Sequence, residues 1–560
     1  MAFDSKYFTG TDSSSYFTEN SNLYKSSQGL TIGDESGMGN SPLSSTTKAI
    51  QHGFQTLMIL MNQPGAGRGA EGIGNVDRIS QQQLDATAEM LRLNKMNFIT
   101  HGPIIDLLGF GGEENKESVI SAEKRDENAR IFEKVIENTD KMAQKADLKN
   151  TPLTIHASNA IGPQGDFFDS GYKTKDGKVI YGQTGSMIKK DTGQLVPMQS
   201  SFKWLPITDS YKNSYELKEG TEENGYALFE ITPKKHFEMA NATALDEVDK
   251  KISDIDIKLQ QLREIHQENS PGFHNLGVER RTLESDRFHL TSGKIGGMEG
   301  ENVFVTATDY MNEMMPNQIT RLAMASYKTK SQPVLAIENM PMHQFGKPEE
   351  VIKIVEESRK KFAKELEDKE GLDYDQARET ANKLIGSTMD IGHLNTLKAK
   401  INPNTNKYWT DDDLKKEAEK MAKAGIKLVH IADNIGEFGK DSHLMLGRGN
   451  AKIDEMLDIL KENGFKGQAA IESYEGEGEF DKVWARNNIR VLGSMYESGR
   501  GPSIMDVDLS APYSSRSSNY GHKVSDLHWS QWGGPFAGMH TTFGGGSADK
   551  RDGFSGTPTN

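Results

Sequence analysis

The chain has 560 residues, more than one ordinary domain usually needs, so a core domain with additions is expected. Its formal net charge of −15 disfavours non-specific electrostatic binding of nucleic acid over a large surface, although the chain could still carry a local basic patch. The absence of cysteine excludes disulfides and thiolate zinc sites, leaving His, Asp and Glu as metal ligands. There is neither a membrane-spanning apolar run nor a secretory signal, so we expect a cytoplasmic protein with no membrane partner.

Short apolar segments alternate with helical patterns through the first part of the chain. Residues 1–29 stand apart, because they are rich in Ser, Tyr, Asn and Thr without a clear period, which indicates an arm of low order. Two of the apolar segments end in a histidine, His101 and His156. Strands are predicted at 30–33, 54–61, 96–101 and 153–156, and helices at 41–53, 81–93 and 116–145.

Residues 160–303 break this alternation with Gly-rich, hairpin-like pieces and one helical segment. In the helical segment, apolar residues recur at alternating spacings of three and four, which is typical of a helical hairpin or a short coiled coil. One interpretation is packing within the insertion, and the other is an arm that joins two copies into a homo-oligomer. The apolar seam at 245–262 consists of Leu245, Val248, Ile252, Ile255, Leu259 and Leu262.

The alternation returns after residue 303. Three of the later apolar segments carry an acid at or near their end, Glu338, Asp390 and Glu472. After residue 499 the chain becomes rich in Ser and Gly, which indicates a tail of low order over 499–560. Strands are predicted at 333–338, 384–393, 426–430 and 467–472, and helices at 311–329, 347–366, 411–424, 450–463 and 480–498.

Eight short apolar strands that alternate with helices predict an α/β fold, a (β/α)₈ TIM barrel. We assign the barrel to 30–159 and 304–498, with a large α+β insertion at 160–303 after the fourth strand. A doubly wound open sheet would also alternate, but it would gather its site at one switch point. Here the candidate site residues come from at least six strands, which favours a closed ring.

The stretch from 428 to 450 contains a concentrated set of candidate metal ligands. It opens as an apolar strand ending in His430, and the loop that follows places Asp441 and His443 two residues apart. In an extended segment, residues two apart point to the same side. A carboxylate and an imidazole facing the same way near a third ligand are typical of a transition-metal site.

Histidines and acids recur at the ends of the other predicted strands. Each one alone is explained by an ordinary structural hydrogen bond. Together at one barrel mouth, so many buried polar and charged side chains would be energetically unfavourable unless bound cations neutralised them. The nine candidate ligands are His101, His156, Glu338, Asp390, His393, His430, Asp441, His443 and Glu472.

Local motifs at these strand ends resemble the endonuclease IV family of apurinic/apyrimidinic endonucleases (AP endonuclease family 2), within the xylose-isomerase-like TIM barrels. The motifs are HGPIIDLLG, LTIHASN, AIENM, TMDIGH, VHIADN, DSHLMLGRGN and AIES. The resemblance covers roughly 30–498 without the insertion, and the DxH–LGxGN run is its most specific part.

The resemblance implies a site with three Zn²⁺ ions, in which Glu338 bridges the first two. It also implies cleavage of the DNA backbone 5′ to abasic sites by a metal-activated hydroxide, with damaged DNA as the partner and Glu338 and Glu472 as catalytic residues. The first ligand set would be His101, His156 and Glu338; the second Glu338, Asp390, His430 and Glu472; the third His393, Asp441 and His443.

Several features depart from the family pattern. The insertion follows strand four, so it leaves from the catalytic face and could cover the mouth. Arg448 stands where the family's LGxGN often has an acid, and it could approach a phosphate or pair with a carboxylate. Three basic pairs in the insertion could contact phosphates, although such pairs are usually solvated charge: Lys189–Lys190, Lys234–Lys235 and Arg280–Arg281.

Two alternatives stay open. One is a sugar isomerase or epimerase of the same fold that uses Mn²⁺ or Mg²⁺, with Glu338 and Glu472 transferring the proton. The other is a non-catalytic assembly protein, in which the insertion and the polar arms make the contacts. The metal count separates the first alternative from the phosphodiesterase, because an isomerase would typically need one or two ions.

Overall fold

The computed structural model describes fifteen stretches of the chain. The predicted N-terminal arm, the helix at 480–498 and the C-terminal tail lie outside them. Within them, no helix is both long and apolar enough to cross a membrane. The described residues are 31–35, 42–52, 54, 56–61, 80–112, 118–156, 158, 172–173, 179–190, 192–292, 303–341, 347–402, 404–405, 407–444 and 446–472.

Eight parallel strands close into a barrel, because β1 pairs with both β2 and the last strand, β20. This confirms the predicted (β/α)₈ barrel. The order of strands around the barrel follows the chain, which brings all their carboxyl ends to one mouth. The strands are β1 (Thr31–Glu35), β2 (Thr56–Leu60), β3 (Asn97–His101), β6 (Pro152–His156), β15 (Val334–Glu338), β16 (Ile385–Asp390), β19 (Ile426–Ile431) and β20 (Gln468–Ile471).

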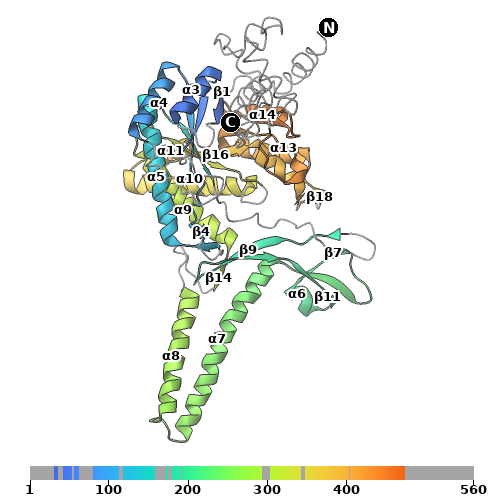
Figure 1. The fold of residues 1–560 in the computed structure, drawn as a ribbon. Helices are drawn as coiled ribbons and strands as arrows, with labels where there is room; N and C mark the ends of the chain where they lie inside the picture. Colours follow the sequence, from blue (N-terminus) through green and yellow to red (C-terminus); the bar gives the residue numbers. More distant parts are fainter. Residues whose placement is uncertain are drawn as a thin grey trace, which may run out of the picture.

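Helices surround the barrel (Figure 1). Two of them begin with a capping box, formed by Ser80 and Gln83 at α4 and by Thr410 and Asp413 at α13. The helices that accompany the barrel are α3 (Pro42–His52), α4 (Gln81–Leu93), α5 (Ala122–Lys145), α9 (Ala307–Tyr327), α10 (Pro348–Glu370), α11 (Tyr374–Leu384), α13 (Asp411–Gly425) and α14 (Ile453–Glu462).

The barrel strands are apolar on both faces because helices cover one face and the opposite side chains fill the interior. Strands β6, β15 and β16 are buried along their whole length. The alternate side chains of four strands form a small separate cluster, which we place inside the barrel. It consists of Met58, Ile99, Leu428 and Ala470.

Several predicted elements differ from the structure in their boundaries, and one helix was missed. The helix expected from 116 begins at Ala122, because Ser118–Ile120 (β5) pairs with Phe110–Gly112 (β4) and Ser121 caps the helix. The strand expected to run to 393 ends at Asp390, where the short helix α12 (Ile391–Asn395) starts. Helix α11 was not predicted.

The insertion consists of small antiparallel sheets and a helical hairpin that projects away from the barrel (Figure 1). Its last strand, β14, lies just beyond the predicted end at 303 and pairs with β9. The elements are β7 (Tyr172–Lys173), β8 (Val179–Ile180), β9 (Thr184–Lys189), β10 (Leu195–Gln199), β11 (Ser201–Pro206), α6 (Asp209–Ser214), β12 (Glu216–Leu217), β13 (Tyr226–Ile231), α7 (Pro233–Glu264), α8 (Pro271–Ser292) and β14 (Phe304–Thr306).

The apolar seam of α7 packs within its own hairpin. Ile255 and Leu259 are buried, whereas the three residues between them are exposed. Helices α7 and α8 contact each other along the hairpin, and Arg280 on α8 lies 2.6 Å from Asp256 on α7. The seam therefore has a partner in the same chain, and association of two chains through it stays a prediction.

We predict that Leu428→Ala lowers the free energy of unfolding by about 2–5 kcal/mol, because it opens a cavity inside the barrel. Leu93→Ala is the matched control, since Leu93 is 65% exposed. Denaturant unfolding of both variants measures the difference. Equal effects of the two changes would contradict the interior placement of Leu428.

Candidate metal centre

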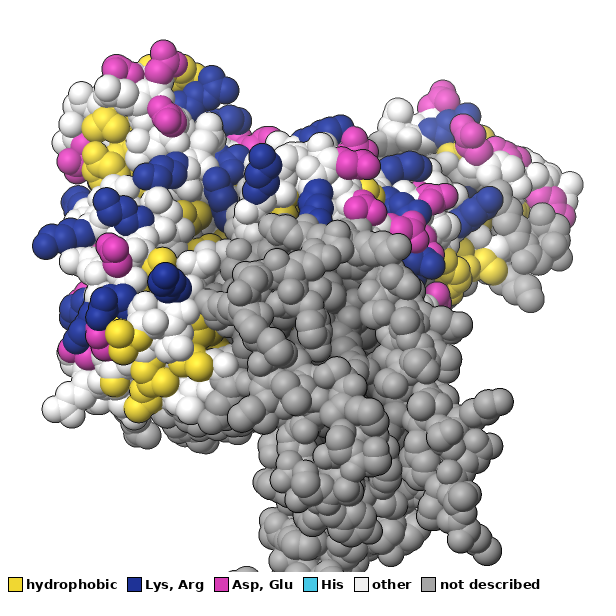
Figure 2. Space-filling model, turned by 90° about the horizontal axis from the view of Figure 1, so that it is seen from above, with side chains coloured by type: hydrophobic (Ala, Val, Ile, Leu, Met, Phe, Trp, Pro, Cys, Tyr) yellow, Lys and Arg dark blue, Asp and Glu magenta, His cyan; other side chains and the backbone are white. Residues whose placement is uncertain are grey.

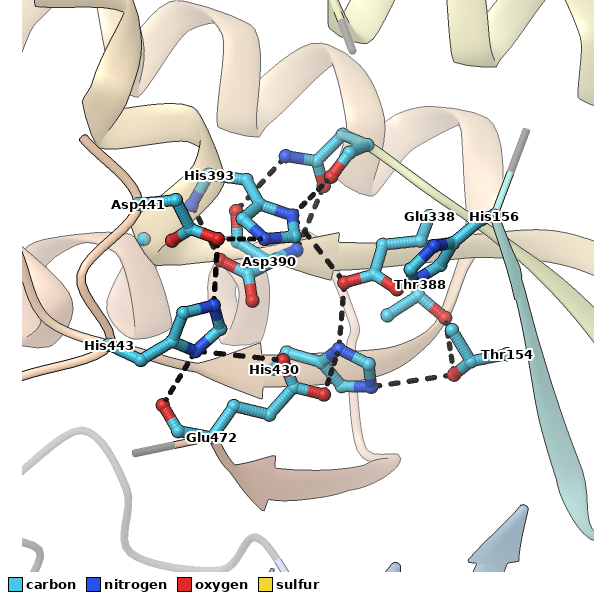
Figure 3. A network of polar contacts seen from close by, with 12 residues as sticks. Thr154, His156, Glu338, Thr388, Asp390, His393, His430, Asp441, His443 and Glu472 are labelled. Atoms are coloured by element: carbon cyan, nitrogen blue, oxygen red, sulfur yellow. Dashed lines mark hydrogen bonds and ion pairs between the residues drawn. The ribbon is translucent and has the colours of Figure 1, made fainter. Parts of the chain in front are cut away.

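The structure brings all nine predicted ligands together at the mouth of the barrel. Figure 3 labels eight of them, all except His101. Six of the nine lie at or next to the carboxyl ends of barrel strands. His393 comes from α12, and Asp441 and His443 come from the loop after β19. Their ligand atoms fall into sets in which all atoms lie within 4.8 Å of one another. Three of these sets are His101, His156 and Glu338; Glu338, Asp390, His430 and Glu472; and His393, Asp441 and His443.

Glu338 joins the first two sets. Its side chain is buried, and its two oxygens face different partners. Oε2 lies 3.3 Å from Nε2 of His156 and 3.6 Å from Nε2 of His101. Oε1 lies 2.9 Å from Nδ1 of His430. This arrangement is the one that a carboxylate bridging two cations requires.

The second set lies at the ends of adjacent strands. Nδ1 of His430 is 2.9 Å from Oε1 of Glu472, as well as close to Glu338. Asp390 divides its oxygens between two roles: Oδ1 accepts a hydrogen bond from the backbone N–H of His393 at 2.6 Å, and Oδ2 accepts none from the described residues. Asp390 thus starts α12 and still presents a free oxygen to the set.

In the third set, Oδ2 of Asp441 lies 3.1 Å from Nε2 of His393 and 2.8 Å from Nε2 of His443. The predicted convergence of Asp441 and His443 is therefore present, but the reason given for it was wrong. His443 has φ 43°, in the left-handed region, so the segment is not extended. The loop turns at His443 and brings the two side chains together.

Backbone and hydroxyl groups contact a ring nitrogen in four of the five candidate histidine ligands. The Nδ1 atoms of His101, His393 and His443 lie 2.8, 2.7 and 3.1 Å from the carbonyl oxygens of Gly102, Asn339 and Glu472. If Nδ1 donates there, Nε2 keeps a lone pair that faces the carboxylates. His430 is reversed: Nε2 lies 3.4 Å from Oγ1 of Thr154, and Nδ1 faces the acids.

Four buried carboxylate oxygens at this mouth accept no hydrogen bond of good geometry from the described residues, although Oε2 of Glu338 and Oε1 of Glu472 lie within ion-pair distance of His156 and His430. Within that part of the chain, no Lys or Arg forms an ion pair with the four carboxylates either. Buried carboxylates without such partners are costly unless cations neutralise them. The donor set is thus one that divalent cations fit. The oxygens are Oε2 of Glu338, Oδ2 of Asp390, Oδ1 of Asp441 and Oε1 of Glu472.

The electrostatics of the metal-free pocket follow from this burial. Burial, with the neighbouring Glu472 and Glu338, raises the pKa of Asp390 to about 7 against the opposing effect of His393. Burial also opposes ionisation of Glu338, yet His430 and the other histidines hold its pKa well below the usual value. Burial would lower the pKa of His443, but Asp441 raises it to about 9.

Two neighbouring residues that the sequence reasoning passed over support the pocket. Asn339 accepts a hydrogen bond from the N–H of Asp390 at 2.8 Å and donates one to its carbonyl at 3.0 Å. Asp433 accepts backbone hydrogen bonds from the loop that carries His443. Asn339 lies in the AIENM motif and Asp433 lies in the VHIADN motif. Their positions next to candidate ligands in the sequence could have identified them as supporting residues.

Comparisons with known proteins agree with the barrel. Residues 317–494 match the family described as xylose isomerase-like TIM barrel. The chain is 27% identical over 214 residues to an uncharacterized protein of Methanocaldococcus jannaschii. That match covers 36% of this chain, and it spans 60% of the length of the curated relative. The second half of this chain is thus similar to xylose isomerase-like TIM barrels.

Two solved structures with different named activities align with this chain at TM-scores below 0.5. A D-tagatose 3-epimerase-like protein is 14% identical, with a TM-score of 0.39 over 84% of this chain and 97% of that one. An endonuclease IV from Thermus thermophilus is 12% identical, with a TM-score of 0.35 over 84% and 99% of the two chains.

We predict that the metal-free protein loses stability as pH rises from about 6.5 to 9. The pKa of His443 is raised from 6.5, so its stabilising contribution is complete below pH 6.5 and is lost as pH rises through about 9. Asp390 acts in the same direction. Because its pKa is raised, its contribution to the stability of the folded protein is lost as pH rises through about 7.

Thermal unfolding in the presence of a chelator, from pH 6 to 9, measures this effect. The same series with added zinc should be flatter, because bound cations replace the protons of the pocket. A chelated protein whose Tm rises over this range would show that the pocket does not titrate as its burial and charges require.

Proposed function

We propose that the protein is a zinc-dependent phosphodiesterase that cleaves the DNA backbone 5′ to abasic sites. The observation that supports this proposal most strongly is the sharing of Glu338 between two donor sets, with a third set beside them. Three cation positions in one pocket match the needs of a reaction in which negative charge develops on several phosphodiester oxygens.

The three donor sets would each hold one ion. Zinc bound there would lower the pKa of water to about 7 and polarise the scissile phosphodiester. Glu338 would hold two ions at a fixed spacing, since its carboxylate is buried between His156 and His430. Glu472 would keep His430 oriented through the contact with Nδ1, and the burial of both acids keeps bulk water from the pocket.

The second donor set alone supports the sugar isomerase or epimerase alternative. Glu338, Asp390, His430 and Glu472 form a complete four-ligand site, and Glu338 and Glu472 could also transfer a proton. Such an enzyme needs one or two ions, most simply Mn²⁺ or Mg²⁺. The isomerase alternative does not explain why a third donor set, with Asp441 between two histidines, lies beside the other two.

The basic pairs in the insertion do not form a separate positive patch among the described residues. Acidic and basic side chains are interspersed on the face in Figure 2. Of the basic pairs in the insertion, Lys190 is buried, Lys235 lies 3.0 Å from Glu238, and Arg280 bonds acids on both sides. DNA recognition is therefore proposed from the pocket and not from these pairs.

We predict that Glu338→Gln abolishes incision of an abasic duplex, by at least ~100-fold, because it removes the carboxylate shared by two ions. Glu417→Gln is the matched control: Glu417 is also buried but pairs with Lys420 on the outer helix α13. Gel analysis of the cleaved strand measures the rate. Equal incision by the parent and Glu338→Gln would overturn the proposal.

The same preparations distinguish the isomerase alternative. Conversion of a ketose by the manganese-loaded parent, together with no incision in zinc, would favour that alternative. Binding of neither ion and no activity on either substrate would favour the non-catalytic assembly protein.

A further inference from the structure

The third donor set depends on a loop without regular structure. Asp441 and His443 lie between the single turn η4 (Gly436–Phe438) and α14, and the loop has left-handed φ values at His443 and Gly447. The first two sets are different, because their members stand at or next to the ends of barrel strands. Something other than the barrel must therefore hold the third set in place.

Asp433 supplies that restraint. It is 1% exposed and lies three residues after His430, at the start of the loop. Its Oδ2 accepts hydrogen bonds from the backbone N–H groups of Gly447 and Gly449, both at 2.9 Å. Its Oδ1 accepts them from Asn434 at 2.9 Å and Ala451 at 3.2 Å.

We call the four backbone hydrogen bonds to the Asp433 carboxylate the Asp433 clamp, and the main chain adds to it. The carbonyl of Asp433 accepts a hydrogen bond from the N–H of Leu444, the residue after His443, at 2.7 Å. A Cβ at Gly449 would lie 2.1 Å from Oδ1 of Asp433, so only glycine allows this close approach. The segment 447–451 is thus wrapped around one buried carboxylate.

The next residue connects the loop to the other half of the third set. Nδ2 of Asn434 donates a hydrogen bond to the carbonyl of Gly392 at 2.7 Å, directly before His393. Asn395 donates to the side chains of Asn434 and Asn450 at 2.9 and 3.0 Å. One dipeptide, Asp433–Asn434, therefore ties the loop carrying Asp441 and His443 to the helix carrying His393.

We infer that Asp433 is the positioning residue of the third cation site, which it builds without being a ligand in any of the donor sets. This inference rests on the proposed function for the existence of a third ion. It implies that the third site can be lost while the first two persist, because Asp433 contacts the loop and not the strand ends that supply those two sets.

We predict that Asp433→Asn binds two zinc ions per chain where the parent binds three. The amide keeps one oxygen and puts an N–H₂ donor against two backbone N–H groups, so half of the clamp is lost. Loss of such a supporting partner typically weakens metal affinity ~10–100-fold. Metal analysis of the dialysed full-length protein, over a series of free zinc concentrations, measures the count and the affinity of the weakest site.

Asp140→Asn is the matched control. Asp140 is also a buried acid that accepts a backbone hydrogen bond, from Ser331 at 2.8 Å, but it lies near the C-terminal end of α5. It should keep three ions even if it unfolds at a lower temperature. Gly449→Ala perturbs the same clamp from the opposite side and should reproduce the loss of one ion if Asp433→Asn fails to fold.

Hydrogen exchange separates failure of this inference from failure of the proposed function. In the metal-free protein, the amides of Gly447 and Gly449 should exchange faster in Asp433→Asn than in the parent. If the parent binds fewer than three ions, the proposed function fails, and the exchange rates still decide the role of Asp433. Three ions bound as tightly in Asp433→Asn as in the parent, or unchanged exchange at both glycines, would overturn the inference.

Discussion

The pocket depends on the burial of one carboxylate, Glu338, between imidazoles that approach it from different strands. An acid with almost no exposed surface is unfavourable in a protein interior unless positive charge lies nearby. His156 and His430 lie on opposite oxygens of Glu338, so each oxygen faces a different donor set. Glu338 therefore connects the surrounding histidines to one another and is also a candidate metal ligand.

The barrel explains why these side chains meet. Parallel strands in chain order place every carboxyl end at the same mouth, so His101 and Glu472 become neighbours although they are separated by most of the barrel sequence. Loops add what the strands cannot supply. His443 reaches the mouth through a turn with positive φ, and hydrogen bonds to the buried Asp433 hold that turn.

Much of this arrangement can be predicted from the sequence, because an apolar run that ends in His, Asp or Glu marks both a strand and its carboxyl end. His101, His156, Glu338 and Asp390 were found in this way. Asp441 and His443 were grouped correctly on a wrong premise, since a loop conformation rather than an extended backbone joins them.

Helix α11 was missed although the sequence marks its start, because Gly371 ends α10 in the left-handed conformation and Asp373 caps the new helix. Its end passes directly into β16 at Leu384 and Ile385, with no turn between the two elements. Other features had no readable signal. The pairing of β9 with β14 joins segments more than a hundred residues apart, which no local pattern specifies. The clamp by Asp433 depends on backbone N–H groups, whose direction follows from the folded loop alone.

Diffraction from crystals of the zinc-loaded protein, recorded on both sides of the zinc absorption edge, tests most directly whether this pocket is a cation cluster. Three anomalous peaks, one within each donor set and two of them sharing Glu338, are the predicted result. A single peak in the second set, or peaks only outside the barrel mouth, would contradict the account.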